Sequence, residues 1–210
     1  MPDVLLPATS GRAKCRGCGR AIKTGELRFG ESLPNPYAEG ETLYWFHPTC
    51  GACMRPEKFL PALKSAVGVP DRDWLERAAE SGLAHHRLVR LAHAERSKSG
   101  KARCRSCREP IDGGVMRFAL CIFEEGRMSP IGFLHVECAN AYFGTTDLLD
   151  RVEKLSPDLD AAALSEVAER LQHQREAADD GDDAPVREGP DVAKVQPPAD
   201  PAAKRAGEGQ

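Results

Sequence analysis

The chain carries two copies of one cysteine and histidine pattern. Each copy has a CxxC pair, then 27 or 28 residues, then an HxxC pair. The eight residues are Cys15, Cys18, His47 and Cys50 in the first copy and Cys104, Cys107, His135 and Cys138 in the second. Three thiolates and one imidazole form a tetrahedral ligand set that suits Zn(II). A single CxxC is compatible with a redox dithiol, but two copies with matched partners favour metal.

The ligand count predicts two structural zinc ions per chain. Four protein ligands leave no open position for a catalytic water. Cys53 offers an alternative, because Cys50 and Cys53 form a CxxC of their own that would make a four-cysteine site without His47. The equivalent position in the second copy is Ala141, so only the HxxC pair is shared. We therefore expect Cys53 and Cys121 to be bystanders, either buried small apolar residues or half-exposed thiols.

The duplication extends beyond the ligands. Gly11–Cys18 is similar to Gly100–Cys107, Leu27–Phe29 to Met116–Phe118, and Pro70–Asp73 to Pro157–Asp160. The offset between copies drifts from 89 to 87, as expected for small loop deletions between two copies of one module. We predict an N-terminal tail (1–9), a first module (10–97), a second module (99–175) and a disordered tail rich in Ala, Pro and acidic residues (176–210).

The predicted fold class is a pair of small α+β modules stapled by zinc, because units of under 90 residues have thin cores. Each module is expected to have a strand after its CxxC pair, a loop, a second strand that delivers the histidine, and then helices. The predicted strands are Glu26–Glu31, Leu43–Phe46, Val115–Phe123 and Gly132–Leu134, and the loops are Ser32–Thr42 and Glu124–Ile131. Helices are predicted from Asp71 or Asp73 to Gly82, over Leu83–Glu95 as a helical connector, and from Ser156 onward.

Several classes of protein are disfavoured by what the sequence lacks. There is no signal peptide and no apolar run of 18 residues, which predicts a soluble, intracellular chain with no membrane partner. In a reducing compartment, eight cysteines favour metal over disulfides. We find no HExxH motif, Walker-type loop or paired-carboxylate constellation, so we expect no enzyme and no small-molecule substrate.

Positive charge is concentrated around both CxxC pairs. Residues 1–150 carry 21 Lys and Arg against 18 Asp and Glu, whereas residues 151–210 carry 8 against 14. The basic residues near the CxxC pairs are Arg12, Lys14, Arg16, Arg20, Lys23 and Arg28, and Lys101, Arg103, Arg105 and Arg108. One such cluster would be ordinary solvated surface, but two at equivalent positions favour a phosphate-binding surface.

The motifs of the two modules resemble a known family. Gly11–Cys18, the strand Leu27–Phe29 and the segment Trp45–Cys50 look like the PARP-type zinc finger, which occurs in poly(ADP-ribose) polymerases and some DNA ligases. The second module differs, since Gly132-Phe-Leu precedes His135 in place of an aromatic Trp-Phe. The resemblance covers both modules, about 160 residues, and it implies a tandem pair that recognises DNA strand breaks.

The resemblance also implies roles for individual residues. Basic residues before each CxxC pair and an arginine on the following strand would contact phosphates; these are Arg12 and Arg28, and Lys101 and Arg117. The neighbouring basic residues Lys14, Arg16, Arg103 and Arg105 would extend that surface. Apolar residues near the following loop would stack on the base pair that a break exposes; these are Tyr37 and Leu43, and Phe123, Met128 and Ile131.

The sequence therefore predicts a non-enzymatic, zinc-dependent sensor or adaptor that binds DNA with strand breaks and works with a DNA repair enzyme. The alternative is a zinc-stabilised interaction module whose basic faces bind an acidic partner or the chain's own acidic tail. A zinc hydrolase is disfavoured by the closed ligand sets.

Overall fold

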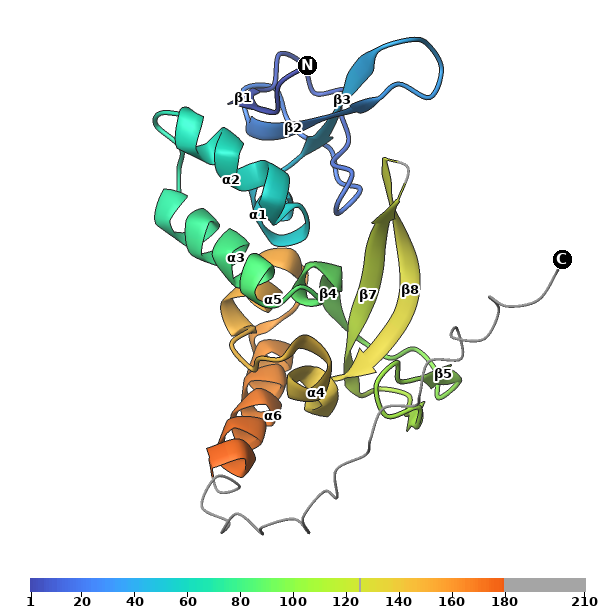
Figure 1. Ribbon diagram of the computed structural model, residues 1–210. Coiled ribbons are helices and arrows are strands. Elements are labelled where there is room, and N and C mark those ends of the chain that lie inside the picture. The colour runs from blue at the N-terminus through green and yellow to red at the C-terminus, as the bar shows by residue number, and fades with distance from the viewer. Residues whose placement is uncertain (125, 180–210) are drawn as a thin grey trace, which may run out of the picture.

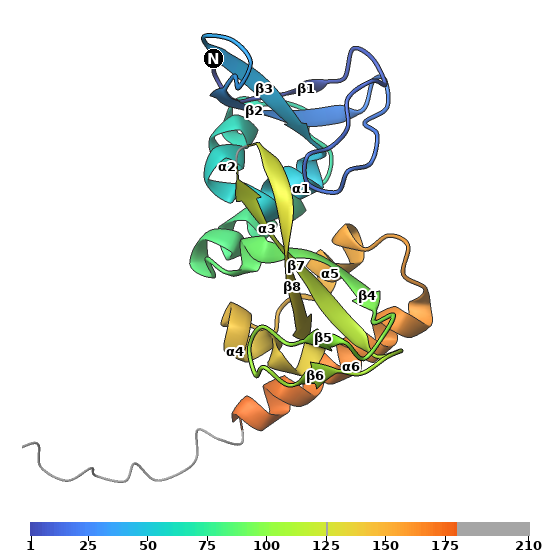
Figure 2. The same cartoon turned by 90° about the vertical axis from the view of Figure 1, so that its right-hand side faces the viewer.

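The computed structural model describes residues 1–124 and 126–179, and they form two similar units, each with a three-stranded antiparallel sheet and helices (Figures 1 and 2). The first unit contains β1 (Val4–Pro7), β2 (Leu27–Pro34), β3 (Glu41–Phe46), α1 (Pro48–Met54), α2 (Pro56–Ser65) and α3 (Arg72–Ala84). The second contains β4 (Leu91–Arg96), β5 (Ala102–Arg103), β6 (Pro110–Ile111), β7 (Met116–Glu124), β8 (Arg127–His135), α4 (Ala139–Phe143), α5 (Leu149–Leu155) and α6 (Ala161–Asp179). Single turns of 3-10 helix lie at Leu88–Arg90 and Val136–Cys138. The strand orders β1-β2-β3 and β4-β7-β8 correspond.

An aromatic cluster forms the core of the first unit. Phe29 on β2 lies 6.0 Å from Phe46 on β3 and 5.3 Å from Phe59 on α2, measured between ring centres. Helix α1 closes over this cluster through Gly51, where a Cβ atom would come within 2.8 Å of both Phe29 and Phe59. Only glycine fits there, so the sequence of α1 is matched to the rings beneath it.

The predicted connector helix Leu83–Glu95 is wrong in its second half. Helix α3 ends at Ala84, and the chain then forms a 3-10 turn and strand β4, which pairs with β7. A register shift between Leu91 and His93 breaks the alternation of β4, so Leu91 and Ala94 both face the core although they are three residues apart. That spacing imitates a helical stripe, which explains the error.

Other boundaries also differ from the prediction. The expected N-terminal tail contains β1, which pairs with β2, and β4 lies in the second sheet although it precedes the predicted boundary at 97–99. The predicted loop Glu124–Ile131 belongs largely to β8, which pairs with β7 up to Glu124. Helix α6 begins after Asp160, whose carboxylate accepts a hydrogen bond from the Ala163 amide at 2.7 Å, not at Ser156.

The two units pack on one continuous core. The β7–β8 hairpin reaches from the second unit to the first, where Phe123 lies 5.6 Å from Phe46 between ring centres (Figures 1 and 2). On the helical side, Arg151 of α5 is 4% exposed and donates hydrogen bonds to the carbonyls of Cys53 and Ala78 in the first unit. These contacts fix the sheets relative to each other.

Within the described residues, no helix has the length and apolar character needed to cross a membrane. Of the predicted disordered tail, residues 176–179 lie at the end of α6, and residues 180–210 lie outside the described residues.

Candidate metal centres and basic surface

The structure brings together both predicted ligand sets. Cys15, Cys18, His47 and Cys50 form one cluster, and Cys104, Cys107, His135 and Cys138 form another, with the ligand atoms of each within 4.8 Å of one another. Both groups are positioned to bind a metal ion. In each, the CxxC pair lies on a turn, the histidine stands at the end of a strand (His135) or directly after it (His47), and the last cysteine lies in the following helical turn.

Both clusters are built by the same local geometry. The Sγ atom of Cys18 lies 3.3 Å from Nδ1 of His47, and that of Cys107 lies 3.4 Å from Nδ1 of His135. Zn–S and Zn–N bonds of about 2.3 and 2.1 Å at a tetrahedral ion separate S and N by about 3.6 Å. The donor set and these separations therefore fit zinc bound through Nδ1.

The second ring nitrogen of each histidine faces an oxygen acceptor. Nε2 of His47 lies 3.8 Å from a carboxylate oxygen of Glu26, and Nε2 of His135 lies 3.0 Å from the carbonyl oxygen of Pro110. An acceptor at Nε2 favours the tautomer in which Nδ1 carries the lone pair that a metal needs. The Pro110 carbonyl thus orients the imidazole of His135 toward its cluster, whereas Glu26 lies beyond hydrogen-bond distance of His47 and contributes only electrostatic attraction.

Proton affinities within the clusters reflect the crowding of thiols. Hydrogen bonding to Cys15 and then Cys18 raises the pKa of His47 to about 10. Burial acts to raise the pKa of Cys104, but hydrogen bonds from the backbone of His135 and other residues outweigh it and lower that pKa to about 7. Burial, with the charge of Cys104, raises the pKa of Cys138 to about 12. The charge of one thiolate thus raises the pKa of its neighbours, and a cation at the centre would relieve this repulsion and favour the ionised thiols.

Cys53 and Cys121 lie outside both clusters. Cys53 is fully buried in α1, and burial raises the pKa of its thiol. Cys121 is 5% exposed, and burial raises its pKa to about 12. Both are packed as small apolar side chains, which is one of the two environments that the sequence suggested for them.

The predicted phosphate-contacting residues fall into two groups. Six are exposed and surround the CxxC turns; these are Arg12, Lys14, Arg16, Lys101, Arg103 and Arg105. The other two, Arg28 and Arg117, are 8% and 6% exposed. The Cζ atom of Arg28 lies 3.6 Å from the centre of the Trp45 ring, and that of Arg117 lies 3.5 Å from the centre of the Phe133 ring.

The aromatic partners Trp45 and Phe133 were missed as functional residues. Each stands two positions before the metal-cluster histidine, on the strand next to the arginine. Stacking on an aromatic face holds a guanidinium by cation–π attraction. The shared position relative to histidine is the sequence signal that could have identified them.

The predicted base-stacking residues differ in their surroundings. Tyr37 is 95% exposed at the β2–β3 turn, whereas Leu43, Met128 and Ile131 are half-buried. Phe123 packs against Phe46 of the first unit and lies under the Arg55 guanidinium, 4.4 Å from its Cζ atom. A hollow of about 710 Å³ separates the hairpin tips, lined by aromatic residues and three arginines: Tyr37, Tyr44, Phe123, Arg16, Arg55 and Arg127.

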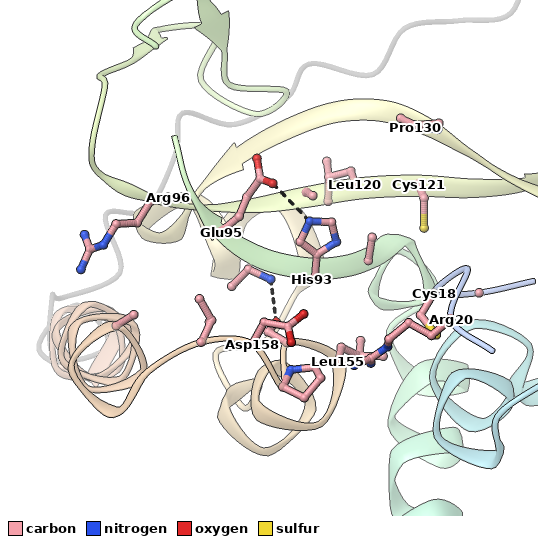
Figure 3. Close-up of a pocket in the computed structure, with 18 of the residues that line it drawn as sticks. Cys18, Arg20, His93, Glu95, Arg96, Leu120, Cys121, Pro130, Leu155 and Asp158 are labelled. Carbon is pink, nitrogen blue, oxygen red and sulfur yellow. Dashed lines mark hydrogen bonds and ion pairs between the residues drawn. The ribbon is translucent and has the colours of Figure 1, made fainter. Parts of the chain in front are cut away.

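A second cavity, of about 690 Å³, lies where the first CxxC turn faces the second unit (Figure 3). Cys18 and Arg20 lie on one side, and Leu155 and Asp158 lie across from them. Strand β4 contributes His93, whose Nε2 atom lies 3.3 Å from a Glu95 carboxylate oxygen. The first Cys/His cluster therefore lies close to the sheet of the second unit.

Comparison with known proteins finds similarity to poly(ADP-ribose) polymerases. The chain is 25% identical over 177 residues to one from Sarcophaga peregrina, which covers 74% of this chain and 18% of the relative. It is 26% identical over 131 residues to poly(ADP-ribose) polymerase 1 of Gallus gallus, covering 53% and 13%, and 25% identical over 142 residues to that of Drosophila melanogaster, covering 58% and 14%. The chain thus spans less than a fifth of the length of these relatives. No family model matches the sequence. The similarity and the two Cys/His clusters together are consistent with PARP-type zinc fingers.

Proposed function

We propose that the chain is a zinc-dependent DNA-binding protein that recognises DNA strand breaks, whether nicks, gaps or ends. It would act as a non-enzymatic, DNA-associated sensor or adaptor that recruits a repair enzyme. One observation carries the proposal: twice in the chain, a Cys₃His cluster lies beside a strand arginine stacked on an aromatic ring and among exposed basic residues. The similarity to poly(ADP-ribose) polymerases supports it.

Zinc would act structurally in this function. In each cluster it would join the CxxC turn to the end of the strand that carries the histidine. The amide of His47 already donates to Sγ of Cys15 at 3.3 Å, and that of His135 to Sγ of Cys104 at 3.5 Å. A metal ion would hold the basic residues on each turn at a fixed distance from the sheet.

Phosphate contacts would supply most of the affinity. The exposed basic residues around the two turns, together with Arg28, are the groups that we propose to contact the DNA backbone. Each neutralised phosphate releases counterions, so affinity would fall steeply with salt. Such contacts cannot by themselves distinguish a nick from intact duplex.

Break selectivity would come from apolar stacking and from bending. Tyr37 is the most exposed of the proposed stacking residues and needs no rearrangement to meet a base. Phe123 would become available only if the β7–β8 hairpin left Phe46 and Arg55. Stacking contributes about 1–3 kcal/mol per base. A nick also bends more easily than intact duplex, where smooth bending costs about 1–6 kcal/mol.

The test measures the affinity of zinc-loaded protein for nicked, gapped and intact duplexes of one sequence. Fluorescence anisotropy of labelled DNA reports the binding. We expect the wild-type chain to prefer broken DNA and Tyr37→Ala to reduce that preference while leaving weak duplex binding. Val67→Ala is a matched control, because Val67 is an apolar residue 98% exposed outside the proposed site.

Salt dependence tests the phosphate contacts separately. Arg12→Ala and Lys101→Ala should each lower the affinity for nicked and intact DNA by the same factor. Each should also reduce the slope of log K against log salt by about one. Lys64→Ala, an exposed lysine on α2, should leave the slope unchanged. Equal affinity for broken and intact DNA would refute break sensing, and an acidic protein partner would then become the leading explanation of the basic surface.

A further inference from the structure

The two strand arginines have the same position but different neighbours. In the first unit β1 pairs with β2, and Leu6 stands opposite Arg28. In the second unit β4 pairs with β7, and Glu95 stands opposite Arg117. Residues opposite each other in an antiparallel pair project from the same face of the sheet. The chain therefore places a leucine beside one arginine and a glutamate beside the other.

Backbone hydrogen bonds confirm that the two positions correspond. The amide of Ala8 donates to the carbonyl of Glu26, and that of Ser97 donates to the carbonyl of Val115, both at 2.8 Å. The carbonyls of Ala8 and Ser97 in turn accept from a glycine amide at 2.8 and 2.7 Å. Ala8 therefore corresponds to Ser97, as Leu6 does to Glu95.

In the second unit, protein groups satisfy Arg117. Its Nε and Nη2 atoms donate to Oε1 of Glu95 at 3.0 and 2.5 Å, and Nη1 donates to Oγ of Ser97 at 3.2 Å. The other carboxylate oxygen of Glu95 lies 3.3 Å from Nε2 of His93 (Figure 3). Burial is the largest single effect on Glu95 and acts to raise its pKa, but the hydrogen bonds and positive charges of Arg117 and His93 together outweigh it, so the net effect is a lowered pKa. A phosphate approaching Arg117 would meet this carboxylate.

In the first unit, Arg28 lacks such partners. Leu6 and Ala8 stand where Glu95 and Ser97 stand in the second unit, and neither side chain can accept a hydrogen bond. Within residues 1–124 and 126–179, Arg28 forms no ion pair, and its Nε atom is buried without a hydrogen-bond partner. A buried cation without an acceptor is costly, and an anion removes that cost.

We propose that Glu95 makes the two modules unequal: the first binds a backbone phosphate through Arg28, whereas in the second Glu95 occupies Arg117 and excludes phosphate from the equivalent site. This inference rests on the proposed DNA-binding function and specifies which half of the surface binds the backbone. Arg117 is then a structural residue that joins β4 to β7. The second module contributes through its exposed turn residues and its hairpin.

The test exchanges the two neighbours and measures the salt dependence of binding to nicked DNA with the full chain. Arg28→Ala and Leu6→Glu should each reduce the slope by about one, because one phosphate contact is lost. Arg117→Ala should leave the slope unchanged, and Glu95→Leu should increase it by about one by releasing Arg117. Glu95→Gln keeps the shape of the side chain and should also increase the slope. It provides the same test if the leucine variant fails to fold. Each variant is first checked for metal content and unfolding midpoint.

Two results of the salt test would overturn the inference: Arg117→Ala reducing the slope as much as Arg28→Ala, or Glu95→Leu and Glu95→Gln both leaving it unchanged. A second measurement does not depend on break recognition. Titration of the wild-type chain with inorganic phosphate should shift the Nε resonance of Arg28 and leave that of Arg117 in place. If nicked and intact DNA bind equally but this difference holds, the break-sensing function fails and the inequality of the modules stands; equal shifts would refute the inequality itself.

Discussion

The ion pair between Glu31 and Arg55 is the contact in the first unit whose removal should be most informative. Glu31 lies on β2 with its side chain fully buried, and Arg55 binds it through two hydrogen bonds, Nε to Oε2 at 2.7 Å and Nη2 to Oε1 at 2.5 Å. The same guanidinium lies over Phe123 of the second unit. One side chain thus neutralises a buried carboxylate and contacts the hairpin of the other module.

We expect Arg55→Met to destabilise the chain by about 3–5 kcal/mol, because it leaves the Glu31 carboxylate buried without a partner. That is a large fraction of the 5–15 kcal/mol typical of a folded domain. With a urea m-value of about 2 kcal/mol/M, the unfolding midpoint should fall by about 1.5–2.5 M. Adding Glu31→Leu should recover most of the loss, because replacing a whole buried pair by apolar groups is often nearly neutral.

The assay is urea unfolding of zinc-loaded protein followed by tryptophan fluorescence. Arg96→Met serves as the control, because Arg96 is exposed and forms a surface ion pair at 2.9 Å with the half-buried Glu166. Its loss should cost under about 1 kcal/mol. The reasoning is refuted if Arg55→Met costs no more than this control, or if the double variant is as unstable as the single one.

Three further predictions concern metal content and the contact between units. Metal analysis of the freshly purified chain and of the Cys53→Ala variant should find two zinc ions in each, whereas the Cys15→Ala variant should contain one. Loss of an ion from the Cys53→Ala variant would show that Cys53 is a ligand. Gly126→Ala should destabilise the chain by about 1–3 kcal/mol, seen as a lower thermal midpoint, because residue 126 has φ +76° and a Cβ there would overlap the Tyr44 ring. Arg151→Met should cost about 2–4 kcal/mol in urea unfolding, because it removes two buried hydrogen bonds from a charged donor to carbonyls of the first unit. An unchanged midpoint would show that the units do not pack in this way.

The ligand clusters could be predicted from sequence because metal coordination imposes its spacing directly on the chain. A CxxC turn and an HxxC turn bring their side chains together whatever the length of the strands between them. The strands that carry Arg28 and Arg117 were predictable for a similar reason, since each follows a CxxC turn and leads back to a histidine. Local chemistry was sufficient in both cases.

Strands β1 and β4 were not predicted because their roles depend on distant partners. β1 is only four residues long and gains its place by pairing with β2, some twenty residues further on. β4 was hidden by the irregularity after Leu91, which gives a strand the spacing of a helix. The repeat itself held the missing information, because the 89-residue offset that relates Arg28 to Arg117 also relates Leu6 to Glu95. Extending the comparison toward the N-terminus would have placed residues 4–8 against residues 93–97 and marked the two segments as equivalent.

The same offset explains how two copies of one module can divide a task. Their shared parts, the ligand clusters and the arginine stacked on an aromatic ring, belong to the elements that fold each unit. One difference lies in the outer strand, where Glu95 stands at the position of Leu6 and the strand still pairs with its neighbour. A substitution there alters the charge beside the arginine and leaves its position unchanged. With the two units held on one core, the exposed basic residues of both turns would contact the backbone, but only the first unit would add a buried arginine. This inequality is how a symmetric duplication could give a surface that distinguishes the two sides of a break.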